Sequence, residues 1–397
     1  MDYRYDVIIC GAGVAGVAAA LECARGGLAT ALVEKTILPG GLATSGLVNI
    51  YLPLCDGQGT QVTFGLAEEL LHLALKYGPG DIPAGWNARP PAGRLQAAFS
   101  PASFVLALDE ALQGAGVTLW LDTLACTPLP DGDRVTGVAV ESKGGRDRLL
   151  APVTIDATGD ADIAARAGVP CEVGTNILSL WALAATLDAA RQAIDAGDGT
   201  ALLTLFAFGG DAVDPHVESA ERTWTLERAA DVTAFALAAR AVLREHYQAA
   251  QAQVGRRNSF PLTLPTMAQY RMTRRIHGRA TLRAGQAGRR HADAVGLAAD
   301  WRAAGSVWEI PYGALLPTGA RGLLAAGRCI SATGDAWHVT RVIPAAALTG
   351  QVAGVAARLA VARRGLPDAL EAAAVQEELR RMGIPCGLAD VYSAPPR

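Results

Sequence analysis

Residues 11–16, Gly-Ala-Gly-Val-Ala-Gly, decide the fold of this 397-residue chain. They follow the apolar run Tyr5–Cys10 and open an alanine-rich stretch, Val14–Arg25, that predicts a helix. A second apolar run, Ala29–Val33, ends in the acid Glu34. This order of strand, glycine turn, helix, strand and acid is the order that a dinucleotide-binding unit requires.

Each glycine of the motif has its own role in such a unit. Gly11 makes the tight turn, Gly13 lets the backbone approach a pyrophosphate, and Gly16 lets the helix pack close to the strand. The pyrophosphate then lies on the unpaired N–H groups at the positive end of the helix. Glu34 lies where a carboxylate accepts from both hydroxyls of an adenosine ribose. The alternative is a glycine-rich turn that binds nothing.

Composition narrows the class of protein. The chain is 51% hydrophobic and 18% charged, so we expect a large buried core, in two domains or in one domain with a large insertion. The net charge of −3 argues against a nucleic-acid-binding surface. The seven cysteines form no C-x-x-C pair, which favours free, mostly buried thiols in a reducing cytosol. The six histidines lack metal-ligand spacing, so we expect no metal.

The sequence also bears on location. The cationic residues are almost all arginine, which together with much alanine and glycine suggests a GC-rich bacterial genome. No signal peptide precedes the first strand, and no apolar run reaches the ~18 residues of a membrane span. We therefore expect a soluble cytoplasmic protein without a membrane partner.

Hydrophobic periodicity and turn residues outline the rest of the chain. Further helices are expected at 60–77, 102–113, 218–251, 345–364 and 368–381, and further strands at 117–122, 135–141, 149–157, 177–187, 260–267 and 323–329. The fold class that we predict is α/β: a Rossmann-like domain with a parallel sheet and an antiparallel three-stranded flap, plus an inserted α+β substrate domain. The flap is formed by the strands within 117–157, the main domain by 1–164 and 316–397, and the insertion by 165–315.

Three further segments place small residues where a flavin would need close backbone approach. The first is 40–46 (Gly-Gly-Leu-Ala-Thr-Ser-Gly), in which Thr44 and Ser45 can donate hydroxyl hydrogen bonds, although an ordinary flexible loop is the alternative. The second is 154–160, and the third is 323–331 followed by 341–344. Proline in the first turn suits the start of a helix, whose positive end would stabilise negative charge on a reduced flavin.

Together these segments resemble the FAD-dependent oxidoreductases of the glutathione-reductase structural superfamily, and they are distantly similar to succinate dehydrogenase and fumarate reductase flavoproteins. Residues 271–278, Arg-x-x-Arg-Arg-Ile-x-Gly, resemble that group's arginine motif, whereas 165–260 match poorly. The resemblance implies non-covalent FAD, with the adenine at the backbone of Ala125 or Cys126 and the pyrimidine edge of the flavin at 343–345. The cofactor-binding residues that we predict are Gly11, Ala12, Gly13, Val14, Ala15, Gly16, Glu34, Lys35, Gly41, Ala43, Thr44, Ser45, Ala125, Cys126, Ala157, Thr158, Gly159, Asp160, Gly327, Arg328, Ile343, Pro344 and Ala345.

The chain departs from the wider superfamily in two ways. Many relatives carry Gly-Asp after the last strand, where the acid binds the ribityl chain, but here Gly327 is followed by Arg328. Asp160 or Asp335 could supply that carboxylate. Cys55 stands alone where disulfide reductases have two cysteines, so thiol–disulfide exchange is not expected. A second nicotinamide motif is also absent from the sequence.

Four residues are candidates for catalysis. His338 would act as a general acid or base and Arg341 would hold a substrate carboxylate, or else both satisfy loop carbonyls. Arg271 and Arg275 lie in a basic stretch, 256–290, that either binds an anionic substrate or is a solvated face. His216 and His246 are expected at the surface.

The function that we expect is hydride transfer between bound FAD and a small organic substrate, anionic if the arginines bind it. The second electron donor or acceptor is either transiently bound NAD(P)H or oxygen. A homodimer is expected from fold analogy only. A nucleic-acid-modifying flavoprotein and a redox-silent FAD-containing binding protein are the alternatives.

Overall fold

The central sheet has five strands, in the order β18-β10-β2-β3-β6, and every pairing is parallel. We describe it from a computed structural model that covers residues 1–82, 96–209, 223–225 and 227–392. The strands are β2 (Val7–Cys10), β3 (Thr30–Val33), β6 (Thr118–Trp120), β10 (Val153–Asp156) and β18 (Leu323–Ala325). Helix α1 (Val14–Arg25) joins β2 to β3 within the predicted bounds. The predicted Rossmann-like fold class is confirmed by this topology.

The flap is a second sheet, in the order β1-β9-β8-β7. Its strands are β1 (Asp2–Arg4), β7 (Leu124–Asp131), β8 (Arg134–Ser142) and β9 (Gly145–Leu150). It therefore has four strands where we expected three: 117–122 contains β6 at the edge of the parallel sheet, and 149–157 is divided between β9 and β10. Strand β7 was missed because Pro128 and Pro130 argue against a strand, yet an edge strand tolerates proline.

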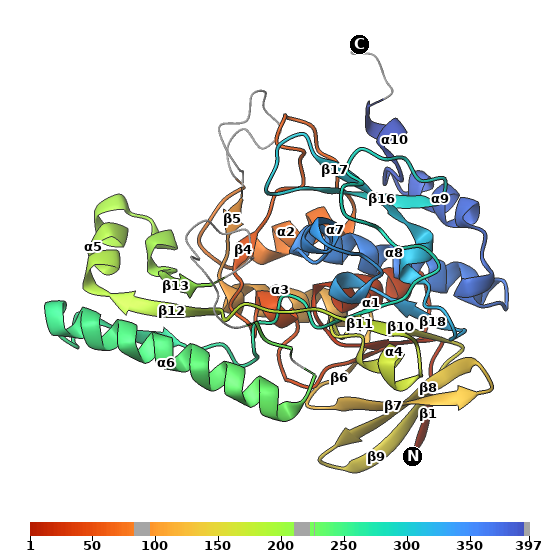
Figure 1. Cartoon of the computed structure of the whole chain (residues 1–397), viewed down its shortest axis with the longest axis horizontal. Coiled ribbons are helices and arrows are strands. Elements are labelled where there is room, and N and C mark those ends of the chain that lie inside the picture. Colours follow the sequence, from red (N-terminus) through yellow and green to blue (C-terminus); the bar gives the residue numbers. More distant parts are fainter. Residues whose placement is uncertain (83–95, 210–222, 226, 393–397) are drawn as a thin grey trace.

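The middle of the chain forms an arm that projects at the left of Figure 1. It consists of the antiparallel sheet β13-β12-β14 together with α5 and α6. The bounds are β12 (Leu180–Thr186), α5 (Leu187–Ala196), β13 (Leu205–Phe208), α6 (Ala229–Val254) and β14 (Ser259–Thr263). Alternate residues of β12 pack on α6 in a small core of their own, which contains Leu180, Ala182, Ala239 and Leu243. The domain boundaries at 164 and 315 stay a prediction. His246 is exposed as expected, and His216 lies outside the described residues.

The remaining elements surround the main sheet (Figure 1). They are β4 (Ile50–Tyr51), α2 (Leu66–Leu75), β5 (Ala97–Ala98), α3 (Pro101–Gly114), α4 (Asp162–Arg166), β11 (Cys171–Val173), β15 (Arg274–Ile276), β16 (Ala294–Ala299), β17 (Val307–Pro311), α7 (Asp335–Thr340), α8 (Ile343–Ala362), α9 (Ala372–Arg381) and α10 (Leu388–Tyr392). Strand β11 pairs with β15, and β16 pairs with β17. The helix expected at 60–77 begins only at Leu66, after Gly65 with φ +70°.

Helix α8 has the length and apolar composition of a membrane-spanning helix, which we did not expect from the sequence. Within the described part of the chain, it is the one helix that is long and apolar enough to cross a membrane, with 20 residues and a mean hydropathy of 1.4. This differs from our expectation that no stretch reaches such a length. Of the tested window, 72% is buried inside the protein, and a core helix of a soluble protein passes the same test.

Glu378 of α9 forms an ion pair with Arg358 of α8, and this contact makes the free energy of unfolding depend on pH. Its carboxylate accepts from Arg381 at 2.6 Å and from Arg358 of α8 at 2.5 Å, and these arginines lower its pKa to about 2. A depressed carboxyl pKa stabilises the folded state above the unfolded pKa of about 4.5 and loses that effect as the pH falls. We expect Glu378→Gln to lower the melting temperature at pH 6. The difference from the parent protein should shrink between pH 4.5 and 3. A difference that stays constant over this range would contradict the role assigned to Glu378.

Candidate active site

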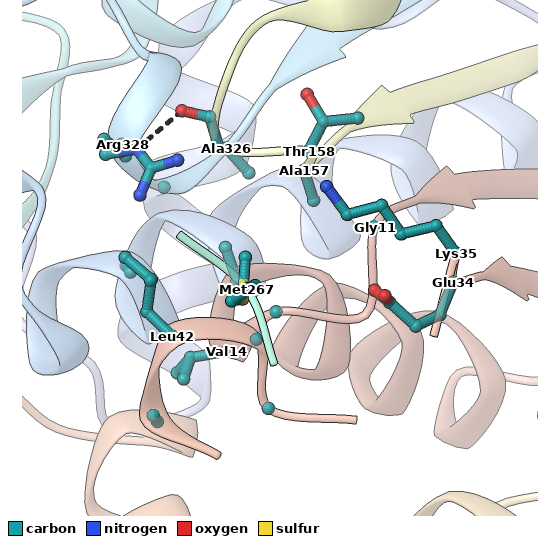
Figure 2. A pocket seen from close by; sticks show the side chains of 18 of the residues that line it. Gly11, Val14, Glu34, Lys35, Leu42, Ala157, Thr158, Met267, Ala326 and Arg328 are labelled. Carbon is teal, nitrogen blue, oxygen red and sulfur yellow. Dashed lines mark hydrogen bonds between the residues drawn. The ribbon is translucent and has the colours of Figure 1, made fainter. Parts of the chain in front are cut away.

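The carboxyl ends of the central strands open onto one cleft of about 980 Å³, a volume that includes its open mouth. Its walls come from the turn after β2, the end of β3, the loop 40–43, residues 123–125, 157–159 and 326–328, and the start of α8. Figure 2 shows Gly11, Glu34 and Thr158 around this space. Ligands of parallel α/β sheets bind outside the carboxyl ends of the strands, where the strand order reverses. Segments from both ends of the chain therefore meet where a dinucleotide is expected.

Sixteen predicted residues line the cleft, and the others do not. Those that line it are Gly11, Gly13, Val14, Ala15, Glu34, Lys35, Gly41, Ala43, Ala125, Ala157, Thr158, Gly159, Gly327, Arg328, Arg341 and Ile343. Ala12, Gly16, Thr44, Ser45, Cys126, Asp160, Pro344, Ala345, His338, Arg271 and Arg275 are not among the lining residues. We missed the lining residues Val33, Gly40, Leu42, Thr123, Leu124, Asp162, Met267, Ala326 and Ala346. Most of these adjoin predicted residues in the sequence, but no pattern pointed to Met267.

The glycines of the first turn differ in what surrounds them. A β-carbon on Gly11, which has φ +96°, would lie 2.6 Å from the carbonyl oxygen of Ala157, and one on Gly16 would lie 1.8 Å from the oxygen of Gly11. A β-carbon on Gly13 would meet no atom within 4 Å. Gly13 therefore borders open space, whereas Gly11 and Gly16 are required by close packing.

The N-terminus of α1 is arranged to receive an anion. Its capping residue is Gly13, no side chain caps the helix, and no acid lies in its first turn. The N–H groups of such a turn carry partial positive charge and suit a pyrophosphate. Open space at Gly13 and uncapped N–H groups beside it fit the diphosphate of a dinucleotide.

The Glu34 carboxylate is buried and held in place by the backbone. Its Oε2 accepts from the N–H of Ala12 at 2.9 Å, and its Oε1 accepts from the N–H of Thr36 at 2.9 Å. The Oε1 atom also accepts from the hydroxyl of Thr36 at 3.0 Å. An ionised carboxylate offers about four acceptor positions, so one position remains, on Oε2, for a ribose hydroxyl. Figure 2 shows Glu34 with Lys35 at one end of the cleft.

Asp156 organises the part of the wall that lies beside the glycine turn. This fully buried carboxylate accepts from the hydroxyl of Thr158 at 2.7 Å and from the N–H groups of Ile163 at 3.0 Å and Ala164 at 2.8 Å. Burial raises its pKa, and the hydrogen bonds oppose that rise. Asp156 thereby holds the turn 157–162 against the cleft, a role that we did not predict.

Arg328 occupies the position where many relatives carry an acid. Its guanidinium donates to the carbonyl oxygens of Gly159 at 2.8 Å and Tyr270 at 3.0 Å, and to the carboxylate of Asp160 at 2.5 Å. Asp160 also accepts from the hydroxyl of Thr273 at 2.5 Å. The buried pair joins the cleft wall to the segment before β15.

Three aspartates can be compared as the acid that would contact the ribityl chain. Asp160 is engaged by Arg328, and Asp335 accepts from the N–H of Gly285 at 3.2 Å; neither is a lining residue. Asp162 does line the cleft, and it forms an ion pair with Arg274. The acid at the ribityl position stays a prediction, and Asp162 joins the candidates.

The predicted catalytic residues lie in two places. Arg341 lines the cleft, whereas His338 lies in α7 outside the lining. Arg275 is buried, pairs with Glu172 of β11, and stacks over Trp337 at 5.9 Å. Burial lowers the pKa of its guanidinium, and Glu172 opposes this. Arg271 is buried too, and its guanidinium lies over the Trp181 ring at 5.4 Å. The structure does not gather the four residues around the cleft.

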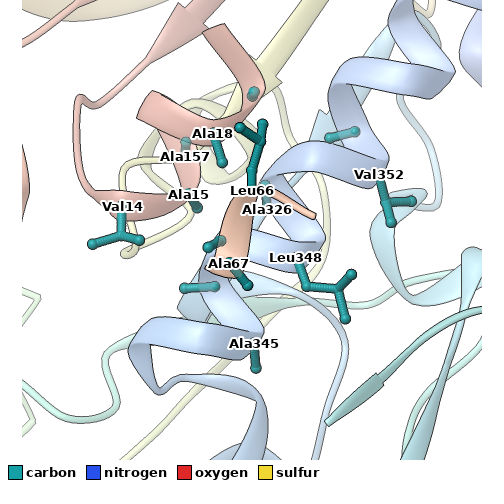
Figure 3. Close-up of a cluster of buried hydrophobic side chains, with 14 of the residues drawn as sticks. Val14, Ala15, Ala18, Leu66, Ala67, Ala157, Ala326, Ala345, Leu348 and Val352 are labelled. Atoms are coloured by element: carbon teal, nitrogen blue, oxygen red, sulfur yellow. The ribbon is translucent and has the colours of Figure 1, made fainter. Parts of the chain in front are cut away.

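Helix α8 brings its N-terminus to the cleft. Ile343 and Ala346 are lining residues, and no side chain caps the helix. Close packing on α1 fixes the helix: a β-carbon on Gly350 would lie 2.0 Å from the carbonyl oxygen of Ala15. Figure 3 shows Ala345 and Leu348 of α8 in the apolar cluster shared with α1.

The cysteines behave as expected. All seven are free, and five of them, including Cys10 and Cys329, are buried. Burial raises the pKa of both of these thiols. A buried thiol with a raised pKa is a poor nucleophile.

A family assignment follows from the same segments. Residues 6–192 and 182–379 match the family described as FAD dependent oxidoreductase. The chain belongs to this family. The predicted cofactor, FAD, and the predicted enzyme class, an FAD-dependent oxidoreductase, are thus confirmed at the level of the family.

Individual relatives match parts of the chain. The probable electron transfer flavoprotein-quinone oxidoreductase YgcN of Escherichia coli strain K12 is 54% identical over 46 residues, which are 12% of this chain and 11% of that protein. The FAD-dependent monooxygenase terD of Aspergillus terreus is 26% identical over 263 residues, which are 56% of this chain and 40% of that protein. The chain thus spans less than half the length of these curated relatives.

One solved structure resembles the chain along most of its length. It is a geranylgeranyl bacteriochlorophyll reductase-like protein from Thermoplasma acidophilum, with a TM-score of 0.49 and 13% identity. The match covers 97% of this chain and 85% of that protein.

Proposed function

We propose that the protein transfers a hydride between a small organic substrate and non-covalently bound FAD. The observation that carries the proposal is the single cleft lined by both the glycine turn after β2 and the start of α8. FAD, when bound, supplies the hydride acceptor or donor. The direction of hydride transfer stays open, and NAD(P)H and oxygen are the candidates for the second electron donor or acceptor. The homodimer and the cytoplasmic location also stay predictions.

The chain's own groups have separate roles in this proposal. The first-turn N–H groups of α1 bind the diphosphate, and Glu34 accepts from the ribose. The positive end of α8 stabilises negative charge at the end of the cleft where Ile343 lies. Leu42 and Met267 supply apolar wall to the cleft and exclude water from it.

The proposal is tested first by the cofactor. The purified protein should be yellow and contain about one FAD per chain, and an anaerobic screen of small organic acids, alcohols and amines should identify compounds that bleach the flavin band. A colourless preparation that takes up no added FAD would reject the proposal. Bound FAD that even dithionite leaves oxidised would instead favour the redox-silent alternative.

The basic stretch that motivated the nucleic-acid alternative is divided: three of its arginines are paired within the chain, whereas Arg256, Arg257, Arg283, Arg289 and Arg290 are exposed. Arg274 pairs with Asp162, Arg275 with Glu172, and Arg279 with Asp368. A phosphate-binding surface needs guanidinium groups available to solvent. Salt-dependent retention of the protein on RNA would restore this alternative.

Arg341 is the predicted catalytic candidate that lines the cleft, so its loss should act on turnover. We expect Arg341→Ala to slow reduction of bound FAD by a substrate from the screen about tenfold or more, because one charge-assisted hydrogen bond is lost. FAD content should stay unchanged. Arg363→Ala, at the exposed far end of α8, is the matched control. Equal rates in the two variants would remove Arg341 from the site.

A further inference from the structure

A second cavity lies at the carboxyl-terminal end of α1. It has a volume of about 870 Å³, which includes its open mouth. Its lining comes from four helices: the end of α1, the start of α2, the inner part of α8 and the end of α9. The cofactor cleft lies at the other end of α1, whose 12 residues span about 18 Å. None of the described residues lines both cavities, so the two are separate.

Glu22 of α1 is the buried acid of this cavity, and its carboxylate has few partners. The residue is 7% exposed, and its Oε2 accepts from Nε2 of Gln351 at 3.1 Å. Among the described residues, the one polar contact of its Oε1 is Nη2 of Arg358 at 3.5 Å, which is too long for a strong hydrogen bond. Burial raises the pKa of this carboxyl, and Gln351 and Arg358 oppose the rise. A carboxylate offers about four acceptor positions, so Glu22 can accept from a ligand in the cavity.

Arg358 of α8 lines the same cavity and is held more closely by another acid. Its Nη2 donates to Glu378 at 2.5 Å, and Glu378 also accepts from Arg381 at 2.6 Å. Its Nη1 donates to no residue in the part of the chain that the structure describes. The cavity thus offers an acceptor on Glu22 and a donor on Arg358, on side chains that approach each other to 3.5 Å.

The other charges at the cavity are neutralised within the protein. Arg25 and Glu69 form two hydrogen bonds, at 2.6 and 2.7 Å. Together with Glu22, Glu378, Arg358 and Arg381, they give equal numbers of acids and arginines in these ion pairs. Such a balance favours neither a cation nor an anion. A ligand with one charge of each sign, however, can bind to Glu22 and to Arg358 at once.

Two glycines let the polar side chains pack against the backbone. A β-carbon on Gly26 would lie 2.1 Å from Cδ of Arg358, and one on Gly65 would lie 2.4 Å from Oε1 of Gln351. Gln351 is only 3% exposed, and its Oε1 accepts from the N–H of Leu66 at 2.8 Å. The polar part of the cavity is therefore built before a ligand arrives, which lowers the entropy cost of binding.

We propose that this second cavity binds a free α-amino acid. The ammonium group donates to Oε1 of Glu22, and the carboxylate accepts from the guanidinium of Arg358. An apolar side chain contacts Leu66 and Met382, which also line the cavity. The site goes beyond the proposed hydride transfer, because none of these residues lines the cofactor cleft.

Three probes with one shared side chain test whether both charges are needed. In isothermal titration calorimetry of the purified protein with its FAD, L-leucine should bind at least about tenfold tighter than 4-methylpentanoate, which lacks the ammonium group. It should exceed 3-methylbutylamine, which lacks the carboxylate, by at least the same factor. Equal affinities, or no leucine binding, would overturn the proposal. Neutral 4-methylpentanamide that binds as tightly as leucine would overturn it too.

Variants then locate the site. Glu22→Gln keeps the shape of the side chain and removes its charge, and it should weaken leucine binding at least about tenfold; Arg358→Gln should act likewise. The matched controls are Glu377→Gln in α9 and Arg363→Gln at the end of α8, which are exposed and should stay within about twofold. If Arg358→Gln fails to fold, Glu22→Gln and the probe comparison decide. Leucine binding that Glu22→Gln leaves unchanged lies elsewhere on the protein and overturns the proposal.

This proposal and the proposed function fail in different ways. A protein that binds and reduces FAD but shows no Glu22-dependent binding of leucine loses the second site and keeps the proposed function. A protein that binds leucine in a Glu22-dependent manner but takes up no FAD loses the proposed function alone.

Discussion

Replacing Gly13 by valine should give a folded protein that has lost its FAD. A β-carbon at Gly13 meets no atom of the protein within 4 Å, so a side chain at this position begins in open space. It would, however, occupy the space in which a diphosphate reaches the first-turn N–H groups of α1. Losing two charge-assisted hydrogen bonds weakens binding by about 3–6 kcal/mol, so we expect FAD affinity to fall at least about 100-fold. Fluorescence titration of the apoprotein with FAD measures it.

Two further glycine variants make this result interpretable. Gly114→Val is the control, since Gly114 ends α3 and its β-carbon also meets nothing within 4 Å; FAD binding should be unchanged. Gly16→Val should instead prevent folding, because its β-carbon would lie 1.8 Å from the oxygen of Gly11. Retention of stoichiometric FAD by Gly13→Val would show that the diphosphate does not lie on this turn.

The glycine turn was predictable because all of its constraints are local. Strand, turn, helix α1 and Glu34 lie within 34 residues, and their order alone specifies the unit. The flap was harder because Pro128 and Pro130 hide an edge strand. Most lining residues that we missed adjoin predicted ones in the sequence, because a motif marks a segment whereas the directions of its side chains depend on the fold.

Contacts between distant segments were not predictable from the sequence. Arg328 and Asp160 are 168 residues apart, and Met267 reaches the cleft from the middle of the chain. Arg275 belonged to a recognisable motif, yet its partner Glu172 is known only from the pairing of β11 with β15. Sequence patterns report the residue types at a site, whereas only the tertiary fold decides which arginine meets an acid and which meets the cleft.

Breaking the pair of Arg328 and Asp160 should have the largest effect on stability. Arg328 is 8% exposed, and three separate groups accept from its guanidinium. Arg328→Met leaves the Asp160 carboxylate without its cation and two backbone carbonyls without their donor. Removal of one partner of a buried pair costs about 3–5 kcal/mol, and we expect a loss of this size in denaturant unfolding followed by circular dichroism.

A double-mutant cycle separates the ion pair from general damage at this position. Asp160→Asn alone removes the charge that Arg328 neutralises, and the double variant removes both charges. Because the unpaired charge is then absent, the double variant should be more stable than the sum of the single effects implies, by about 1–3 kcal/mol. Additive losses would show that the pair is not coupled. In that case, the arginine after Gly327 stabilises the cleft wall through Gly159 and Tyr270 alone.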